Sequence, residues 1–162
     1  MISSGSSSNP SNFISIRIHL LCRTRRGFPL ISDDLQPELW AYVGGIVKRI
    51  GLKLYQVGGY RDHMHVFFGI PSGISVGCAA QSIMDKSSVW IRQTPKMAMF
   101  QWQSSYGAFS VSGSHSDATM AYIRRQKEHH QKRNLKQELI QILRAHGVAP
   151  TDQGFWMESS SG

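Results

Sequence analysis

Seven residues near the N-terminus of this chain alternate strictly between apolar and polar side chains. They run from Ile14 to Leu20, with the isoleucines and Leu20 at every second position. Because successive side chains of a strand point to opposite faces of a sheet, this pattern predicts a strand that is buried on one face only. We therefore expect the chain to build a sheet, with this half-buried strand as its first element.

The segments that follow predict a helix and then a hairpin. After a basic turn at Arg23–Gly27, Asp33 or Asp34 can cap a helix that ends at Gly51. Its apolar residues recur at i+4 spacing, namely Leu35, Leu39, Val43 and Val47. Residues 52–57 and 63–70 are predicted strands, and the Gly58–Asp62 turn between them indicates an antiparallel hairpin.

The second half of the chain predicts a helix over residues 75–93, then two short strands over 100–103 and 108–111. A final helical region begins near Ser114–Asp117 and runs to His146, with Asn134 as the candidate point of division. This order predicts an α+β fold with one antiparallel sheet, helices on one face and an open second face.

The length and composition indicate one globular domain. We assign residues 13–156 to it, and the serine-rich segments 1–12 and 157–162 to a flexible N-terminal segment and a flexible tail. No apolar run is long enough to span a membrane, no secretory signal is recognisable, and the spacing of Cys22 and Cys78 does not indicate a zinc site. We expect a cytoplasmic, bacterial-type protein. The net charge of +8 favours a polyanionic partner, with nucleic acid as the first candidate.

The tripeptide His63-Met64-His65 lies in the predicted strand 63–70. Side chains at i and i+2 leave a strand on the same face, roughly 7 Å apart, so two imidazoles can converge on one divalent ion. Met64 and Val66 would point to the opposite face and anchor the strand in the core. The alternative is that both histidines simply lie on a polar sheet face.

A second group of polar residues lies on the predicted helix after residue 117. At about 100° per residue, one narrow stripe contains Tyr122, Gln126, His129 and Arg133. Tyr122 is a candidate nucleophile beside a metal, and Gln126 would supply a third ligand oxygen. This ligand set favours Mg²⁺ or Mn²⁺ over a closed zinc site. The alternative is an ordinary solvated helix with Tyr122 as its last core contact.

The remaining polar residues carry weaker signals. His19 is predicted to be a surface residue, His115 and His130 are ambiguous, and His146 is expected at a helix end. Trp90 and Trp102 are predicted core residues. The candidate DNA-contacting residues are the basic side chains of the first turn and of the polar helix: Arg23, Arg25, Arg26, Arg124, Arg125, Lys127 and Arg133.

Four segments of the chain, and the order in which they occur, resemble the single-tyrosine HUH transposases of small bacterial insertion sequences. These enzymes are related to the repeat-associated tyrosine transposases. These segments are residues 62–67 (DHMHVF), Trp102-Gln103, residues 106–112 (YGAFSVS) and residues 122–130 (YIRRQKEHH). The resemblance covers roughly residues 13–156. Ser104-Ser105 departs from it, because family members often have a pair ending in glycine there, and this concerns the geometry of the loop.

The resemblance implies a ferredoxin-like or RNA-recognition-motif-like sheet. It also implies that His63, His65 and Gln126 bind the divalent metal and that Tyr122 is the nucleophile. Tyr122 would attack a phosphodiester in single-stranded DNA at hairpin-containing element ends, leaving a 5′-phosphotyrosine bond and a free 3′-hydroxyl. The implied assembly is a homodimer in which Tyr122 of one subunit serves the histidines of the other.

Three other functions remain open at this stage. A non-catalytic nucleic-acid-binding module on the same sheet would leave the pairing of Tyr122 with Gln126 unexplained. A domesticated relative that nicks genomic repeats would have the same residues. A metal-dependent hydrolase that uses water is disfavoured, because no carboxylate accompanies the histidines on their strand face.

Overall fold

The alternating N-terminal segment forms an inner strand of a four-stranded antiparallel sheet. The computed structural model describes residues 12–150, and its strand order is β2-β3-β1-β4. The strands are β1 (Ile16–Thr24), β2 (Lys53–Gly59), β3 (His63–Ile70) and β4 (Trp102–Ser110). With one helix after β1 and another after β3, this is the ferredoxin-like topology, so the predicted α+β class is confirmed.

Two helices cover the first face of the sheet, as predicted. They are α1 (Leu35–Arg49) and α2 (Val76–Arg92), and the main core lies between them and the strands. Leu20, Met64 and Val66 enter this core from the sheet, while Val43 and Ile83 enter it from the helices. The even-numbered residues of β3 therefore anchor the strand, which leaves its odd-numbered residues for the second face.

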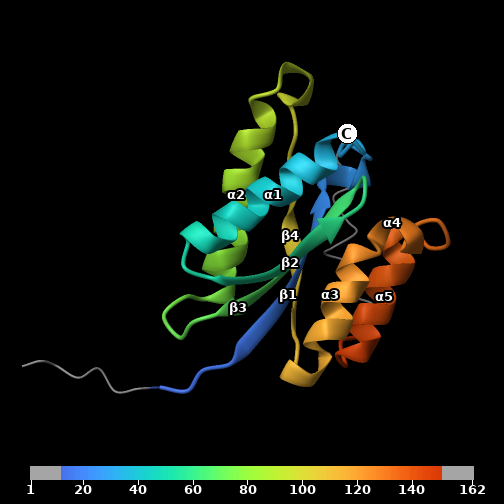
Figure 1. Cartoon of the computed structure of the whole chain (residues 1–162). Coiled ribbons are helices and arrows are strands. Elements are labelled where there is room, and N and C mark those ends of the chain that lie inside the picture. The colour runs from blue at the N-terminus through green and yellow to red at the C-terminus, as the bar shows by residue number, and fades with distance from the viewer. Residues whose placement is uncertain (1–11, 151–162) are drawn as a thin grey trace, which may run out of the picture.

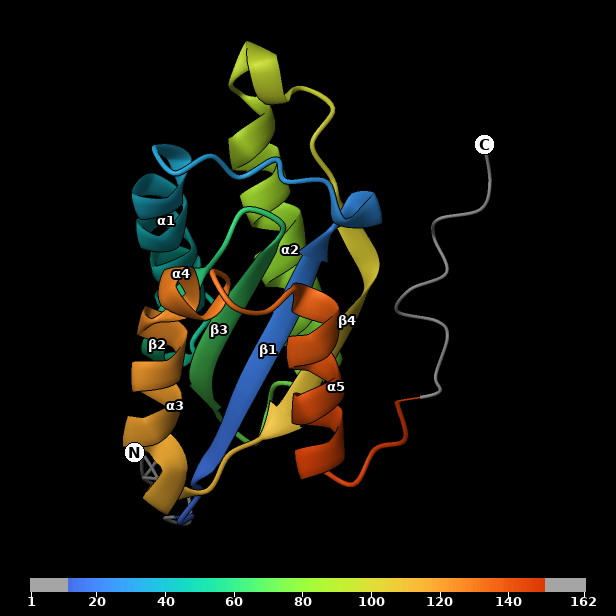
Figure 2. The same cartoon turned by 90° about the vertical axis from the view of Figure 1, so that its right-hand side faces the viewer.

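The second face of the sheet is covered rather than open. Further helices lie across it (Figures 1 and 2), so that the sheet is the middle layer, with helices on both faces. They are α3 (Ser116–Arg124), α4 (Gln126–His129) and α5 (Leu135–Ala145). The physical reason is that the second face also carries apolar side chains: Leu21 and Phe109 pack with Leu135 and Leu139 of α5 in a smaller cluster.

The two short strands expected over residues 100–111 are one continuous strand, β4. The sequence predicted an interruption between two strands at Tyr106 and Gly107. These residues instead pair with Cys22 and Leu21 of β1. A Cβ at residue 107 would lie 2.9 Å from the Phe109 ring, so a larger residue than glycine would have to displace that ring. Three short 3₁₀ turns, at Arg25–Gly27, Pro95–Met97 and Gly113–His115, complete the elements.

The predicted terminal helical region is divided into α3, α4 and α5. Asn134 does mark a division: its side chain accepts a hydrogen bond from the Gln137 backbone N–H, and the Gln137 side-chain Oε1 accepts one from the Asn134 backbone N–H. This capping box starts α5 in a defined position. Residues 1–11 and 157–162 of the expected flexible ends lie outside the described residues. Between residues 12 and 150, no helix has the length and apolar character needed to cross a membrane.

Candidate active site

His63 and His65 lie side by side on the second face of β3, as the i, i+2 spacing predicted. Their ring centroids are 5.0 Å apart. Both side chains are fully buried, in contrast to the open face expected from the sequence, because α3, α4 and α5 cover this part of the sheet. The pair is therefore shielded from bulk water in the chain as described.

The Nδ1 atom of each histidine is held by a neighbouring side chain. His63 Nδ1 lies 2.7 Å from Asp62 Oδ1, and His65 Nδ1 lies 2.7 Å from Nε2 of His19. Both Nε2 atoms consequently face the space beneath the helices. Metal-binding histidines are typically held in this way, with the second nitrogen engaged by a neighbouring group.

The prediction that His19 is a surface residue is wrong. Its side chain is buried and stacks on the His65 ring at a centroid distance of 5.0 Å. The register of β1 against β3 pairs Leu21 with His65, which puts His19 one position further along the same face. Strand register was not available from the sequence, and alternation alone assigned His19 to a face expected to meet solvent.

Tyr122 and Gln126 approach the histidines from the helical layer. Gln126 is buried, and its Oε1 lies 2.8 Å from His63 Nε2. The Tyr122 ring centroid is 5.8 Å from that of His65 and 5.0 Å from that of His129. The structure therefore brings together the four residues predicted for catalysis and metal binding, although α3 ends at Arg124 and the predicted continuous stripe does not extend to Arg133.

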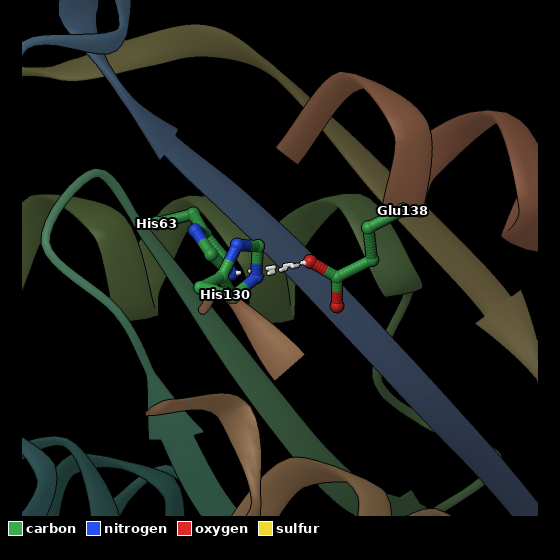
Figure 3. A group of neighbouring side chains, drawn as sticks. All are labelled: His63, His130 and Glu138. Atoms are coloured by element: carbon green, nitrogen blue, oxygen red, sulfur yellow. Dashed lines mark hydrogen bonds and ion pairs between the residues drawn. The ribbon is translucent and has the colours of Figure 1, made fainter. Parts of the chain in front are cut away.

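Glu138 is a residue of the site to which the sequence assigned no role. It lies on α5 with its carboxylate directed at the histidines (Figure 3), and its side chain is buried. Its Oε1 accepts hydrogen bonds from the Tyr122 hydroxyl and from Gln126 Nε2, the latter at 2.9 Å. The same oxygen is 3.1 Å from His65 Nε2, and Oε2 is 3.5 Å from His63 Nε2.

A signal for Glu138 was present in the sequence. It lies between Leu135 and Leu139, three and one residues away, on the apolar face of an amphipathic helix. A carboxylate on such a face needs a polar partner in the interior. No carboxylate lies beside the histidines on their own strand, but α5 supplies one from the other side of the cluster.

His130, which the sequence left ambiguous, belongs to the same cluster. Its Nε2 lies 2.6 Å from Glu138 Oε2 and 3.1 Å from Gln126 Oε1, and its ring stacks on Tyr60 at 5.1 Å. His63, His130 and Glu138 each offer one ligand atom within 4.8 Å of the others (Figure 3). His146, by contrast, caps the end of α5, as expected.

Burial and mutual contact shift the pKa values of these groups in different directions. Burial raises the pKa of Tyr122, and the neighbouring Glu138 carboxylate raises it further. Burial also lowers the pKa of His65, and it lowers that of His19 to about 3. Burial acts to raise the pKa of Glu138, but the hydrogen bonds and charges of the surrounding histidines outweigh it and hold this pKa below its usual range. Without a further cation, the tyrosine is thus held as the neutral phenol.

The donor atoms of this cluster suit a divalent metal ion. Nitrogen comes from two imidazoles, and oxygen comes from an amide and a carboxylate, a mixture that Mn²⁺ and Mg²⁺ sites accept. Among residues 12–150, His65 Nε2 is a buried nitrogen that lacks a well-formed hydrogen bond, although Glu138 Oε1 is close to it. A nitrogen in this position is ready to bind an ion.

The basic residues predicted to contact DNA lie around the cluster at the surface or near it. Arg23 donates a hydrogen bond to Gln103 near the start of β4, and Arg25 donates one to Gln101 just before that strand. Arg124 donates a hydrogen bond to Gln56 of β2. Exposed positions are also taken by Arg26, Arg125, Lys127 and Arg133. Lys127 pairs with Asp33 at 3.7 Å, and Arg133 donates to Gln141.

A pocket of about 510 Å³ lies beside His130, at the edge of the cluster. It is lined by Asp62 and His130 together with the cationic side chains of Arg61, Lys132 and Arg133. Positive charge next to a buried metal-type site is what an enzyme acting on a phosphodiester requires.

The ferredoxin-like sheet, the paired histidines and a tyrosine in contact with their cluster are the arrangement expected of the transposases that the sequence resembles. The family described as "Transposase IS200 like" matches residues 12–126, well over half of the chain. The chain therefore belongs to the IS200-like transposases, which confirms the resemblance inferred from the sequence.

Two solved structures have the same fold. A candidate transposase from Deinococcus radiodurans R1 is 18% identical, with a TM-score of 0.58 over 73% of this chain and 95% of that one. A REP-associated tyrosine transposase bound to a REP hairpin is 13% identical, with a TM-score of 0.55 over 76% of this chain and 74% of that one. At these identities the likeness establishes the fold alone. None of the curated proteins matches the chain.

Proposed function

We propose that this protein cleaves and rejoins single-stranded DNA at hairpin-containing element ends, with Tyr122 as the nucleophile. The observation that carries the proposal is the contact between the Tyr122 hydroxyl and the carboxylate that also touches His63 and His65. A tyrosine at this position would be next to any phosphate bound at the histidines. Membership in a transposase family supports a DNA-cleaving enzyme.

The proposed chemistry is an exchange of phosphodiester bonds. The Tyr122 hydroxyl oxygen attacks the phosphorus, the bond to the 3′-oxygen breaks, and the leaving 3′-oxygen takes up a proton while the phenol proton is released. The products are a 5′-phosphotyrosine and a free 3′-hydroxyl. Since one phosphodiester replaces another, the reverse attack by a second 3′-hydroxyl joins strands without a nucleotide cofactor.

A divalent ion, Mg²⁺ or Mn²⁺, would be held by His63, His65 and Gln126. When bound there, the ion would supply Lewis-acid polarisation of the scissile phosphate and positive charge beside the Tyr122 oxygen. The need for it follows from the raised pKa of Tyr122, which burial and Glu138 keep protonated. Asp62 and His19 would hold the two imidazoles with Nε2 toward the ion.

The single-stranded substrate would approach along the basic pocket beside His130. Arg61, Lys132 and Arg133 there would bind its phosphates. The solved relative bound to a REP hairpin makes a folded hairpin the first substrate to test. We also propose that the protein forms a homodimer.

The test is a covalent-adduct assay with labelled single-stranded hairpin DNA and Mn²⁺. The unchanged protein is expected to form an adduct that survives a denaturing gel. Tyr122→Phe is expected to form none while binding the hairpin within a few-fold of the parent affinity, because only the hydroxyl is lost. An adduct formed by the Tyr122→Phe protein would overturn the assignment of the nucleophile.

Tyr106→Phe is the matched control. Tyr106 also loses one hydroxyl, but its ring packs against the main core on the other side of the sheet. This variant is expected to form the adduct at a rate similar to that of the parent.

A further inference from the structure

Glu138 lies outside the region that matches the transposase family. The match ends at Gln126, whereas Glu138 belongs to α5, which the family match does not reach. Its carboxylate nevertheless touches each of the groups predicted for metal binding and catalysis: His63, His65, Gln126 and Tyr122.

We propose that Glu138 is a ligand of the divalent metal, so that this chain binds the ion with a carboxylate in addition to His63, His65 and Gln126. The inference rests on the proposed function, since it concerns the same site. It adds an anionic ligand from a helix that the sequence analysis assigned no function.

The separations between the candidate ligand atoms support one shared ion. His63 Nε2 is 2.8 Å from Gln126 Oε1 and 3.5 Å from Glu138 Oε2, and His65 Nε2 is 3.1 Å from Glu138 Oε1. Adjacent ligands of an octahedral ion with bonds of about 2.1 Å are about 3 Å apart. The ligand atoms thus already have roughly the spacing that one ion of this size requires.

The charge of the site also favours a carboxylate ligand. Two imidazoles and an amide carry no negative charge, so binding a divalent cation with these alone would leave its full charge in a buried place. Glu138 supplies one negative charge at the same point. Mg²⁺ and Mn²⁺ prefer carboxylate oxygen to neutral ligands.

The contacts of Glu138 also connect the metal with the nucleophile. Gln126 Nε2 donates a hydrogen bond to Glu138 at 2.9 Å and so orients the carboxylate. The Tyr122 hydroxyl donates to the same oxygen. An ion held by Glu138 would therefore lie next to the hydroxyl that is proposed to attack.

The test is the affinity for Mn²⁺ alone, measured by titration calorimetry in the full chain without DNA. Glu138→Gln keeps the shape of the side chain but removes its charge, and we expect Mn²⁺ affinity to fall at least tenfold. Glu128→Gln is the control, since Glu128 is an exposed carboxylate on α4 and this variant loses the same charge. Its affinity for Mn²⁺ is expected to stay within about twofold of the parent.

A purely structural role for Glu138 gives a different result. The Glu138→Gln protein would then be less stable, yet its Mn²⁺ affinity and the rise in its unfolding temperature on adding Mn²⁺ would equal those of the parent. That outcome overturns the proposal. If Glu138→Gln does not fold, Glu138→Asp replaces it: its shortened carboxylate is also expected to weaken Mn²⁺ binding, and unchanged affinity is equally decisive against the proposal.

Failure of this inference can be separated from failure of the proposed function. Unchanged Mn²⁺ affinity in Glu138→Gln, together with an adduct that depends on Tyr122, removes Glu138 from the ligands and leaves the DNA transferase standing. Absence of any adduct in the parent protein overturns the proposed function, whereas the Mn²⁺ titrations still decide whether Glu138 binds the ion.

Discussion

Two histidines on one strand bind a metal well only if their rings are held in one orientation. Here Asp62 is hydrogen-bonded to Nδ1 of His63, and His19 is hydrogen-bonded to Nδ1 of His65. Both Nε2 atoms therefore face the same space. For His65 to bind an ion through Nε2, its Nδ1 must donate its proton to His19 Nε2. His19 must then remain neutral, and burial lowers its pKa to about 3.

This buried neutral histidine predicts a dependence of stability on pH. The unfolded chain takes up a proton at His19 below about pH 6.5, whereas the folded chain resists it down to about pH 3. Between these values the unfolded state binds more protons, so the free energy of unfolding falls as pH falls, by at most about 1.4 kcal/mol per pH unit. The effect is absent above pH 6.5, where both states are neutral at this residue.

His19→Gln tests this prediction, because glutamine can still accept from His65 Nδ1 but does not titrate. Urea unfolding of the metal-free protein at pH 7.0, 6.0 and 5.0 should show a smaller loss of stability in His19→Gln than in the parent. The other titrating groups of the cluster are common to both proteins. Equal losses would show that His19 is not the buried neutral group described here.

The elements that carry the site depend on a close approach between α3 and β2. A Cβ at Gly58 would lie 2.6 Å from the carbonyl oxygen of Ile123, the residue that follows Tyr122. Only glycine allows the helix to lie this near the strand. Because α3 holds Tyr122 above β3, its distance from the sheet also sets the position of the nucleophile.

We predict that Gly58→Ala lowers the free energy of unfolding by about 1–3 kcal/mol, because the added methyl group has to displace helix backbone. Adduct formation should fall by more than this loss of folded protein explains, since Tyr122 moves with α3. Gly45→Ala in α1 is the control: a Cβ there meets no atom within 4 Å, so stability should be unchanged or slightly increased. Parental activity in folded Gly58→Ala protein would contradict the prediction.

At the level of elements, the sequence predicted what local pattern determines and failed where distant segments decide. Alternation located β1, the i+4 spacing of apolar residues located α1, and the turn after Val57 identified the hairpin of β2 and β3. The position of α5 on the sheet depends on Leu21 and Phe109, which lie more than twenty residues from it in the chain. Local pattern does not show such contacts between distant segments. The roles of Glu138 and His19 and the burial of His63 were therefore missed, since each depends on α5 or on strand register.

At the level of the whole molecule, the excess of basic residues predicts salt-dependent binding to single-stranded DNA. The chain carries a net charge of +8, and Arg25, Arg125 and Lys132 lie at its exposed surface. With about four to six phosphate contacts, the slope of log affinity against log salt should be roughly −3 to −4. This slope can be measured by the fluorescence anisotropy of a labelled hairpin at salt concentrations from about 50 to about 300 mM. A slope near zero would contradict binding through phosphates.

The structure also bears on whether two subunits share each active site. The sequence led us to expect Tyr122 of one subunit to serve the histidines of the other. Within the described chain, however, Tyr122 meets the cluster of its own histidines, and α5 supplies Glu138 to the same cluster. Moving these helices to a partner would first expose Leu135 and Leu139, which pack on Leu21 and Phe109. We therefore expect each chain to form a complete site, whether or not it dimerises.

Mixing two inactive proteins decides between these arrangements. One carries Tyr122→Phe and the other carries His63→Ala with His65→Ala, and they are combined under conditions shown by mass to exchange subunits. If each site comes from one chain, every site in a mixed dimer still lacks either the nucleophile or the histidines, so no adduct forms. If the helices are exchanged, one site of each mixed dimer is intact and adduct formation should recover toward half of the parent level per mixed dimer. Recovery would thus restore the shared site predicted from the sequence, and its absence despite proven exchange would assign nucleophile, histidines and Glu138 to a single chain.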